Sequence, residues 1–493
     1  MADDENFVIL HTESESFRFR MKQIIRESNT NFPKWTYNKN RLIMLIRVVA
    51  TNFRSYGQET EFNMLPSQNV RRFDWHVHNS AKGANVLRTA VIYGANGAGK
   101  SCLIKAIGRL QEMVINGTVP PPFFRDANKF NDPEKPVTLE MEFGTDDNQY
   151  SYGVSYRGNT CVEEWLYSTV KAKPECIFER KIEEKSGKIR INLKVSKREE
   201  AKSKLLVSLL ETNLLKGNEL MLSKRDVVKN KHITAAYNWI VSKLTVIDPE
   251  THSTSIFDDR YSDKVFKEQS EKLITALDLG INGLTLKDED IESFKLRMAE
   301  WPGLIQSIDD IVKQLSEQSE DDREALLESG AFTVNIRKEG DKFYARRVQA
   351  RHEVNDRQYD FELKEESDGT QRVFDFVPMV HHVKNDACTF VIDEIDRSLH
   401  PTLVRALVKR IVTDRGMKGQ LIFTTHDAGL LDGKIFRNDE IWFAEKDHET
   451  QNTSLYTLDE FKPRADLDIE KGYLNGRFGA IPFLAKLNEL NWE

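Results

Sequence analysis

The sequence predicts an α/β fold in which a parallel sheet is combined with an antiparallel β region and a helical insert. Three observations predict it. A short β-like run, 87–93, leads through a glycine-rich loop into a segment with helical spacing, 102–114. Alternating apolar residues over 136–195 are typical of β-hairpins. From 374 to 438, helices alternate with short apolar strands, which is the pattern of a parallel sheet.

The composition is that of a large globular protein. The 493 residues include 71 Lys and Arg against 78 Asp and Glu, and 39% are apolar, which is enough to bury a sizeable core in about two to four domains. No apolar run approaches the roughly 18 residues that span a bilayer. The acidic start, residues 1–5, differs from a secretory signal. We therefore expect a cytoplasmic chain with no membrane contact and with reduced thiols at its four scattered cysteines.

Four regions follow from the pattern along the chain. Residues 1–43 form a polar N-terminal extension to which the sequence assigns no role, and residues 44–198 form a first lobe with the glycine loop and the hairpins. Residues 199–330 are predicted as a helical insert, and residues 331–493 as a second lobe. Within the insert, the acidic segment 317–328 is interpreted as a loop and helix face that could dock a basic partner.

The glycine-rich loop carries the strongest functional signal. Gly94-Ala-Asn96-Gly97-Ala-Gly99-Lys100-Ser101 matches the Walker A pattern G-x-x-x-x-G-K-S between a strand and a helix. The glycines let backbone N–H groups turn toward a β-phosphate, Lys100 neutralises the β and γ oxygens, and the Ser101 hydroxyl ligates Mg²⁺. The loop therefore predicts a site for ATP and Mg²⁺.

Two further strands are expected to complete this site. The apolar run 389–392 delivers Asp393 and Glu394 at the edge of a parallel sheet where ligands bind. This Walker B pattern predicts that Asp393 holds Mg²⁺ and that Glu394 polarises the attacking water as a general base. The run 420–424 leads to His426, which is expected to contact the γ-phosphate or position the water.

A second anion cradle is predicted before the helix-like run 373–380. Ser367 and Gly369 would offer a hydroxyl and backbone donors at a helix N-terminus. Because one cradle suffices for one nucleotide, a second one indicates a homo-oligomer in which two chains share each ATP. An N-cap and a turn explain this segment equally well.

With these motifs in this order, the chain resembles the ABC/SMC-head-type prokaryotic AAA ATPases, including the OLD-like proteins of abortive infection. The resemblance runs from about Met44 to the C-terminus, and its remaining pieces are 44–47, 52–55, 393–401, 439–446 and 473–482. It implies a P-loop ABC-type ATPase head in which Ser367 to Gln371 is the signature loop, Asp396 lies in the D-loop and His426 is the switch histidine. Asp368 stands where that signature usually has glycine.

The resemblance also implies a biological role. Many such ATPases are components of bacterial anti-phage systems, so we expect an ATP-hydrolysing switch or sensor subunit whose ATP-driven assembly controls a partner effector such as a nuclease. The alternative is a RecF-like DNA-binding repair ATPase, and a third possibility is a scaffold with a structural ATP. The candidate nucleic-acid surface is 180–231, where Arg180 to Lys204 holds ten Lys or Arg against four Glu. A solvated hairpin or helix face explains these charges as well.

Overall fold

The computed structural model describes residues 24–26, 43–80, 83–121, 126–145, 148–170, 173–183, 185–194, 200–249, 264–317, 324–329, 332–464 and 466–481. The chain divides into two compact units. Unit 1 comprises 1–37 and 250–381, and unit 2 comprises 38–249 and 382–493. A strand at 244–247 pairs with one at 389–392, so both strands belong to unit 2 although residues of unit 1 lie between them in the sequence. The predicted boundaries after 43, 198 and 330 stay a prediction.

A six-stranded sheet with a parallel core organises unit 2. Its order is β12 (Leu244–Ile247), β18 (Thr389–Ile392), β19 (Gln420–Thr424), β6 (Thr89–Tyr93), β20 (Ile441–Lys446) and β21 (Thr453–Thr457). All neighbours are parallel except β20 and β21. Every residue of β6, β18 and β19 is buried, which explains why these strands read as continuous apolar runs. The predicted parallel sheet is confirmed.

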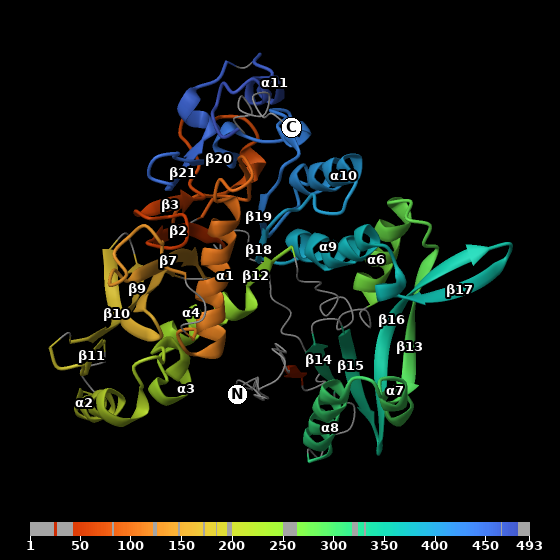
Figure 1. Ribbon diagram of the computed structural model, residues 1–493, viewed down its shortest axis with the longest axis horizontal. Coiled ribbons are helices and arrows are strands. Elements are labelled where there is room, and N and C mark those ends of the chain that lie inside the picture. Colours follow the sequence, from red (N-terminus) through yellow and green to blue (C-terminus); the bar gives the residue numbers. More distant parts are fainter. Residues whose placement is uncertain are drawn as a thin grey trace, which may run out of the picture. The chain divides into compact units, whose positions relative to one another are not determined.

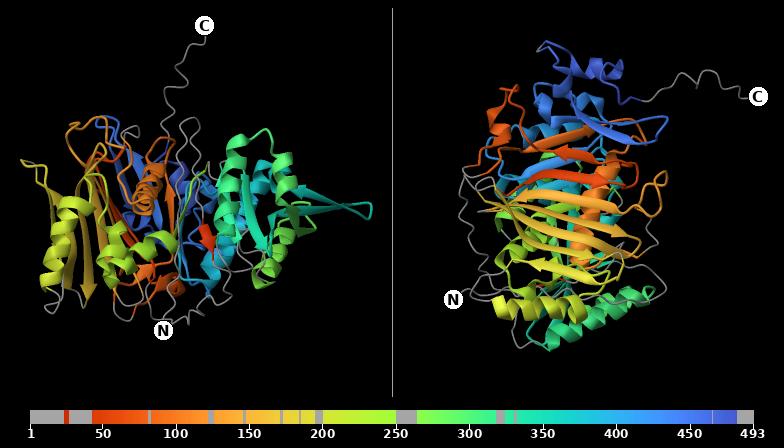
Figure 2. Two further views of the ribbon diagram at one scale, coloured as in Figure 1. Left: turned by 90° about the horizontal axis from the view of Figure 1, so that it is seen from below. Right: turned by 90° about the vertical axis from the view of Figure 1, so that its left-hand side faces the viewer.

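A seven-stranded antiparallel sheet forms the other layer of unit 2, seen face-on in the right-hand view of Figure 2. Its order is β11 (Ile189–Leu193), β10 (Lys173–Ile182), β9 (Thr160–Val170), β8 (Gln149–Arg157), β7 (Val137–Gly144), β2 (Leu45–Thr51) and β3 (Thr60–Asn63). These strands confirm the predicted hairpins, although two residues of the predicted turn, 146 and 147, lie outside the described residues. Helix α1 (Lys100–Asn116) packs against strands of both sheets (Figure 1).

One buried side chain links the two sheets of unit 2. Gln420, at the start of β19, accepts a hydrogen bond from the Leu45 amide at 2.9 Å. Its own amide donates to the carbonyl oxygens of Leu45 and Leu87 at 3.0 and 2.9 Å. Gln420 is fully buried, so these bonds satisfy backbone groups that water cannot reach.

The remaining elements of unit 2 lie around these sheets. They are η1 (Asp74–His76), β4 (Val77–His78), β5 (Val86–Leu87), α2 (Glu200–Leu209), η3 (Leu210–Leu214), η4 (Leu222–Lys224), α3 (Arg225–Val228), α4 (Lys231–Ser242), α10 (Pro401–Val412), η6 (Ala428–Leu430), η7 (Asn438–Glu440), η8 (Leu458–Phe461) and α11 (Ile469–Leu474). None of the helices in the described part of the chain combines the length and the apolar character that crossing a bilayer requires. Within the described part of the chain, Cys102, Cys161, Cys176 and Cys388 form no disulfide.

Unit 1 is built on an antiparallel sheet. Its order is β1 (Ile24–Arg26), β14 (Glu324–Ser329), β15 (Phe332–Glu339), β16 (Lys342–Val354) and β13 (Gly283–Asp290), and β17 (Arg357–Glu362) also pairs with β16. The other elements are α6 (Lys264–Ala276), α7 (Ile291–Arg297), α8 (Pro302–Ser316), η5 (Leu363–Glu365) and α9 (Asp368–Asn385), whose last residues belong to unit 2. Phe294, Ile308 and Leu315 pack with Ala325 and Ile336 in its core.

The segment 199–330 contains the predicted helices, but it is not purely helical. β12, β13 and β14 interrupt it, and β12 joins the parallel sheet of unit 2. The prediction of a helix face within 317–328 is wrong for residues 324–328, because they belong to β14, which pairs with β15. Ala325 and Leu327 alternate into the core, so pairing with a neighbouring strand overrides the helical preference of Glu, Ala and Leu. Residues 318–323 lie outside the described residues.

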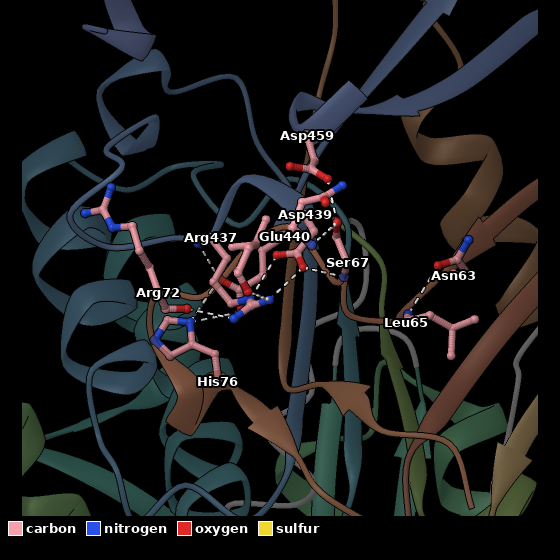
Figure 3. Close-up of polar contacts among 11 residues, drawn as sticks. Asn63, Leu65, Ser67, Arg72, His76, Arg437, Asp439, Glu440 and Asp459 are labelled. Atoms are coloured by element: carbon pink, nitrogen blue, oxygen red, sulfur yellow. Dashed lines mark hydrogen bonds and ion pairs between the residues drawn. The ribbon is translucent and has the colours of Figure 1, made fainter. Parts of the chain in front are cut away.

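A buried arginine fastens the loop after β3 to the C-terminal part of unit 2 (Figure 3). The Arg437 guanidinium, 3% exposed, donates to both carboxylate oxygens of Asp439 at 2.9 and 2.8 Å and to the carbonyl oxygens of Arg72 and Val70 at 2.7 and 3.0 Å. Asp439 also accepts from the Ser67 amide at 2.8 Å. Asp439, which lies in a segment of the family resemblance, therefore has a structural role.

Replacing Arg437 with methionine should lower the free energy of unfolding by about 3–5 kcal/mol, because the buried Asp439 carboxylate loses its partner. Denaturant unfolding of the full chain measures this loss. Arg464→Met is the matched control, since Arg464 is exposed and its change should stay within about 0.5 kcal/mol. Equal stability of the two variants would contradict the role assigned to Arg437.

Candidate nucleotide site

The glycine loop lies between β6 and α1, as the sequence predicts, and its shape depends on two close approaches. A Cβ atom on Gly94 would collide with the Ala444 carbonyl oxygen of β20, and one on Gly99 would collide with Thr453 of β21. Gly99 also has a φ of 101°, a left-handed conformation that side chains disfavour. The hairpin β20–β21 therefore lies against the loop and leaves only glycine room at these two positions.

Lys100 begins α1 and its ammonium group points back into the loop. Nζ donates to the carbonyl oxygens of Gly94 and Ala95 at 2.7 and 3.3 Å, and the residue is 5% exposed. Burial lowers the pKa of Lys100 to about 8, opposed by the negative charges of Asp393, Glu394 and Asp396. The lysine thus remains mainly a cation at neutral pH, at the N-terminus of a 17-residue helix whose dipole also favours anions.

The two acidic residues after β18 are held by a threonine from the neighbouring strand. Thr424 Oγ1 donates to Asp393 Oδ1 at 2.6 Å and accepts from the Glu394 amide at 2.7 Å. The Glu394 backbone has a φ of 50°, in the left-handed region, and this hydrogen bond helps to hold it there. Asp393 is 2% exposed, whereas the Glu394 side chain is 35% exposed and so accessible to a ligand.

His426 lies between the lysine and the glutamate. Its amide donates to Asp396 Oδ2 at 3.0 Å, its Nδ1 is 3.5 Å from Lys100 Nζ, and its Nε2 is 4.0 Å from Glu394 Oε1. Partial burial and the charge of Lys100 lower the pKa of His426 below its ordinary value. Because an ammonium group offers only donors, Nδ1 acts as an acceptor and the neutral ring carries its proton on Nε2, toward Glu394.

Lys100, Glu394 and His426 line one cavity of about 650 Å³, within the size range of small-molecule sites. Gly94 and Asp393, which were also predicted for the site, are not among its lining residues. Of the predicted site residues, those on the cavity wall are Asn96, Gly97, Gly99, Lys100, Ser101, Glu394, Asp396 and His426. The cavity is also lined by Ser55, Cys102, Arg397 and Lys446, which were not predicted as site residues. Ser55 and Lys446 fall within two segments of the family resemblance, 52–55 and 439–446. Membership in these segments was the only feature of the sequence that could have marked them as site residues.

The residues present fit a nucleotide with Mg²⁺. Gly97 of the loop lines the cavity, and a Cβ atom there would meet nothing within 4 Å. The loop therefore leaves open space at this position, and Lys100 supplies a cation on the wall of the same cavity. Ser101 and Asp393 offer a hydroxyl and a carboxylate, the oxygen ligands that Mg²⁺ prefers when phosphates and water complete its coordination.

The second predicted cradle belongs to unit 1. Ser367 caps α9, because its Oγ accepts from the Thr370 amide at 3.2 Å and lies 2.9 Å from Thr370 Oγ1. Its carbonyl oxygen accepts from the Gln371 amide at 2.9 Å. Gly369 lies in the first turn of the same helix. The local geometry is therefore that of a helix N-cap, which was one of the two interpretations of this segment. The binding of a phosphate there stays a prediction.

Several basic residues of the segment 180–231 are buried or paired with acidic side chains in the part that the structure describes. Arg180 is fully buried and donates to backbone carbonyl oxygens, including that of Gly217 at 3.0 Å, so it cannot contact nucleic acid. Other basic side chains pair with glutamates. The pairs are Lys181–Glu163, Arg190–Glu183, Lys194–Glu175 and Lys224–Glu219. Residues 195–199 lie outside the described residues.

Comparison with known proteins identifies a family. The family described as "AAA domain, putative AbiEii toxin, Type IV TA system" matches residues 90–432. This range includes the loop at 94–101 and the strands that end at Asp393 and His426. The match confirms the predicted relation to prokaryotic AAA ATPases with a link to abortive infection. No curated protein matches the sequence.

Solved structures with a similar chain trace include three SMC heads, each 11% identical in sequence. The Smc head bound to the C-terminal winged-helix domain of ScpA matches over 85% of this chain and 100% of its own, with a TM-score of 0.38. The SMC head domain from Thermotoga maritima matches over 84% of this chain and 98% of its own, with a TM-score of 0.34. The Smc head with an extended coiled coil, bound to the C-terminal domain of ScpA from Pyrococcus furiosus, matches over 85% and 100%, with a TM-score of 0.36.

Proposed function

The chain belongs to this AAA-domain family, and from that premise we propose that it hydrolyses ATP with Mg²⁺ as the switch subunit of a cytoplasmic bacterial anti-phage defence system. One observation carries the proposal. Lys100, Glu394 and His426 follow three different strands and line the same cavity. His426 lies between the other two, with Nδ1 3.5 Å from Lys100 Nζ and Nε2 4.0 Å from Glu394 Oε1. A cation that binds the phosphates and a residue that positions or deprotonates the attacking water are recurring parts of phosphoryl-transfer sites, and Lys100, Glu394 and His426 would supply them.

Each group has a role that its surroundings support. Lys100 and the backbone amides of the loop bind the β- and γ-phosphates. Glu394 accepts a proton from the attacking water, and the Nε2–H of His426 lies on the side of the ring that faces this carboxylate, where it can orient the water or the γ-phosphate. Mg²⁺ held by Ser101 and Asp393 would neutralise phosphate charge.

We further propose that two chains share each ATP. The amide donors and hydroxyl at the start of α9 are suited to a phosphate, and the cavity in unit 2 already contains its own phosphate loop. If a second chain presents this cradle, bound ATP would hold the two chains together, and hydrolysis would let them separate. This cycle would hold or release a partner effector, for which a nuclease is the first candidate.

Mixing two inactive variants tests the shared site. Lys100→Ala removes the phosphate cation, and Gly369→Asp places a negative charge at the second cradle. In a mixed dimer one site carries both changes and the other carries neither. A one-to-one mixture should therefore recover about a quarter of the wild-type ATP turnover, because half of the dimers are mixed and each has one intact site of two.

Each variant alone is the control and should stay inactive. No recovery in a mixture whose subunits are shown to exchange would mean that each chain holds ATP by itself. Full activity of Gly369→Asp alone would lead to the same conclusion.

A further inference from the structure

A second cavity, of about 480 Å³, lies in unit 2 and has no part in the nucleotide chemistry. Its walls are Glu445, Tyr456, Glu460, Phe461, Phe478 and Gly479. These residues come from β20, β21, η8 and the segment that follows α11. We call this cavity the acidic aromatic pocket.

Neither carboxylate of the pocket pairs with a cation among the residues that the structure describes. Glu445 accepts hydrogen bonds from the Tyr456 hydroxyl at 2.9 Å and from the Ala480 amide at 3.2 Å. Glu460 accepts from the Thr457 amide at 2.8 Å and its hydroxyl at 3.3 Å. All these donors are neutral, and within the described ranges neither glutamate has an ion pair. The pocket therefore presents two uncompensated negative charges.

The aromatic wall of the pocket is partly open to solvent. The Phe461 ring lies 5.7 Å from that of Tyr456 and 5.4 Å from that of Phe478, in the second case edge to face. Phe478 is buried and stacks on Phe443, whereas Phe461 is 43% exposed. An exposed ring beside carboxylates attracts a flat cation in two ways, through the face of the ring and through charge-assisted hydrogen bonds.

The pocket and the nucleotide cavity share the β20–β21 hairpin. Glu445 lines the pocket, while the next residue, Lys446, lines the nucleotide cavity, because neighbouring side chains of a strand point to opposite sides. On β21, Tyr456 lines the pocket, and Thr453 donates to the Ala98 carbonyl oxygen of the glycine loop at 2.8 Å. A group bound in the pocket thus touches the hairpin that shapes the glycine loop.

We propose that the acidic aromatic pocket receives an arginine side chain from a partner protein. Arginine fits better than lysine because its planar guanidinium stacks on a ring and donates to two carboxylates at once. The inference rests on the proposed function in one respect, since it supposes that this ATPase works with a partner. Beyond that function, it specifies that the partner binds through an arginine side chain and that this arginine contacts the β20–β21 hairpin.

Site-specific photocrosslinking tests the pocket in the full-length protein. Benzoylphenylalanine replaces Phe461, which keeps a ring at this half-open position, and the crosslinked peptide is mapped after irradiation of the native cell. We expect an adduct to a separate protein within a peptide that contains arginine. Adding Glu460→Gln should lower the yield at least about tenfold, as expected for the loss of one charge-assisted hydrogen bond.

The glutamine keeps the oxygen that accepts from Thr457, so the turn at η8 is retained. Glu449→Gln is the matched control, because Glu449 is exposed on unit 2 and does not line the pocket, and it should leave the yield unchanged. Changing the mapped arginine of the partner to glutamine should reduce the yield as Glu460→Gln does.

Several results would overturn the proposal. They are the absence of an adduct, an adduct to a second copy or to residues 482–493 of the same chain, and a yield that does not depend on Glu460. ATP turnover, measured on the same proteins, separates this proposal from the previous one. A charge-dependent adduct without turnover would refute the ATPase function alone, and turnover without an adduct would refute the pocket alone.

Discussion

Replacing Glu394 with glutamine should lower the rate of ATP hydrolysis by at least about a hundredfold, the usual contribution of a general base. Glutamine keeps the size of the side chain and one acceptor oxygen, but it cannot take a proton from water. The backbone at 394 is held by Thr424 through its amide, so the substitution leaves the carboxylate of Asp393 and the cavity in place. ATP binding should therefore be retained.

The comparison requires both binding and turnover. Binding of ATP is measured by calorimetry and turnover by phosphate release, with Glu470→Gln as the control because Glu470 is exposed and does not line the cavity. If Glu394→Gln released phosphate at the wild-type rate, another group would have to be the base.

Replacing Lys100 with alanine should weaken ATP binding by about a hundredfold, the cost of removing one partner from a buried charge contact. The ammonium group is almost fully buried and is oriented by the carbonyl oxygens of Gly94 and Ala95. Water therefore cannot substitute for it beside the phosphates. The stability of the protein should fall little, because burial already disfavours the charged lysine in the absence of phosphate, as its lowered pKa shows.

Lys105→Ala is the matched control for this variant. Lys105 lies on the same helix but is exposed to solvent, so its removal should leave the affinity within about twofold. Calorimetric titration of both variants with ATP and Mg²⁺ measures the difference. Equal affinities would show that Lys100 does not contact the nucleotide.

The core of the site could be predicted from the sequence because its signals are local. The glycines before Lys100 and the apolar run before Asp393 each specify a strand end, and parallel pairing of β6, β18 and β19 then brings these ends to one edge. The other residues that line the cavity could not be predicted from the sequence. Lys446 reaches it only because β20 lies beside β6, a neighbour relation that joins residues some 350 positions apart in the sequence and has no local signature.

Charge patterns were the least reliable guide. Arg180 belongs to a basic run and yet is fully buried, since the antiparallel sheet turns it toward backbone carbonyl oxygens of the 216–217 turn. The acidic stretch 317–328 contains helix-favouring residues, but its part from 324 to 328 lies in strand β14, because β15 pairs with it. In both cases the structure of the charged residues depends on contacts with another segment of the chain. A run of like charges does not reveal which of its residues face inward.

Phosphate release by the purified full-length protein tests the central claim most directly, which is that the cavity at the ends of β6, β18 and β19 hydrolyses ATP. We expect the wild-type protein to release phosphate from ATP with Mg²⁺, to stop when the metal is chelated, and to remain bound to ATP without release when Glu394 is glutamine. Bound ATP with no phosphate release from the wild-type protein would contradict the claim and favour a structural nucleotide.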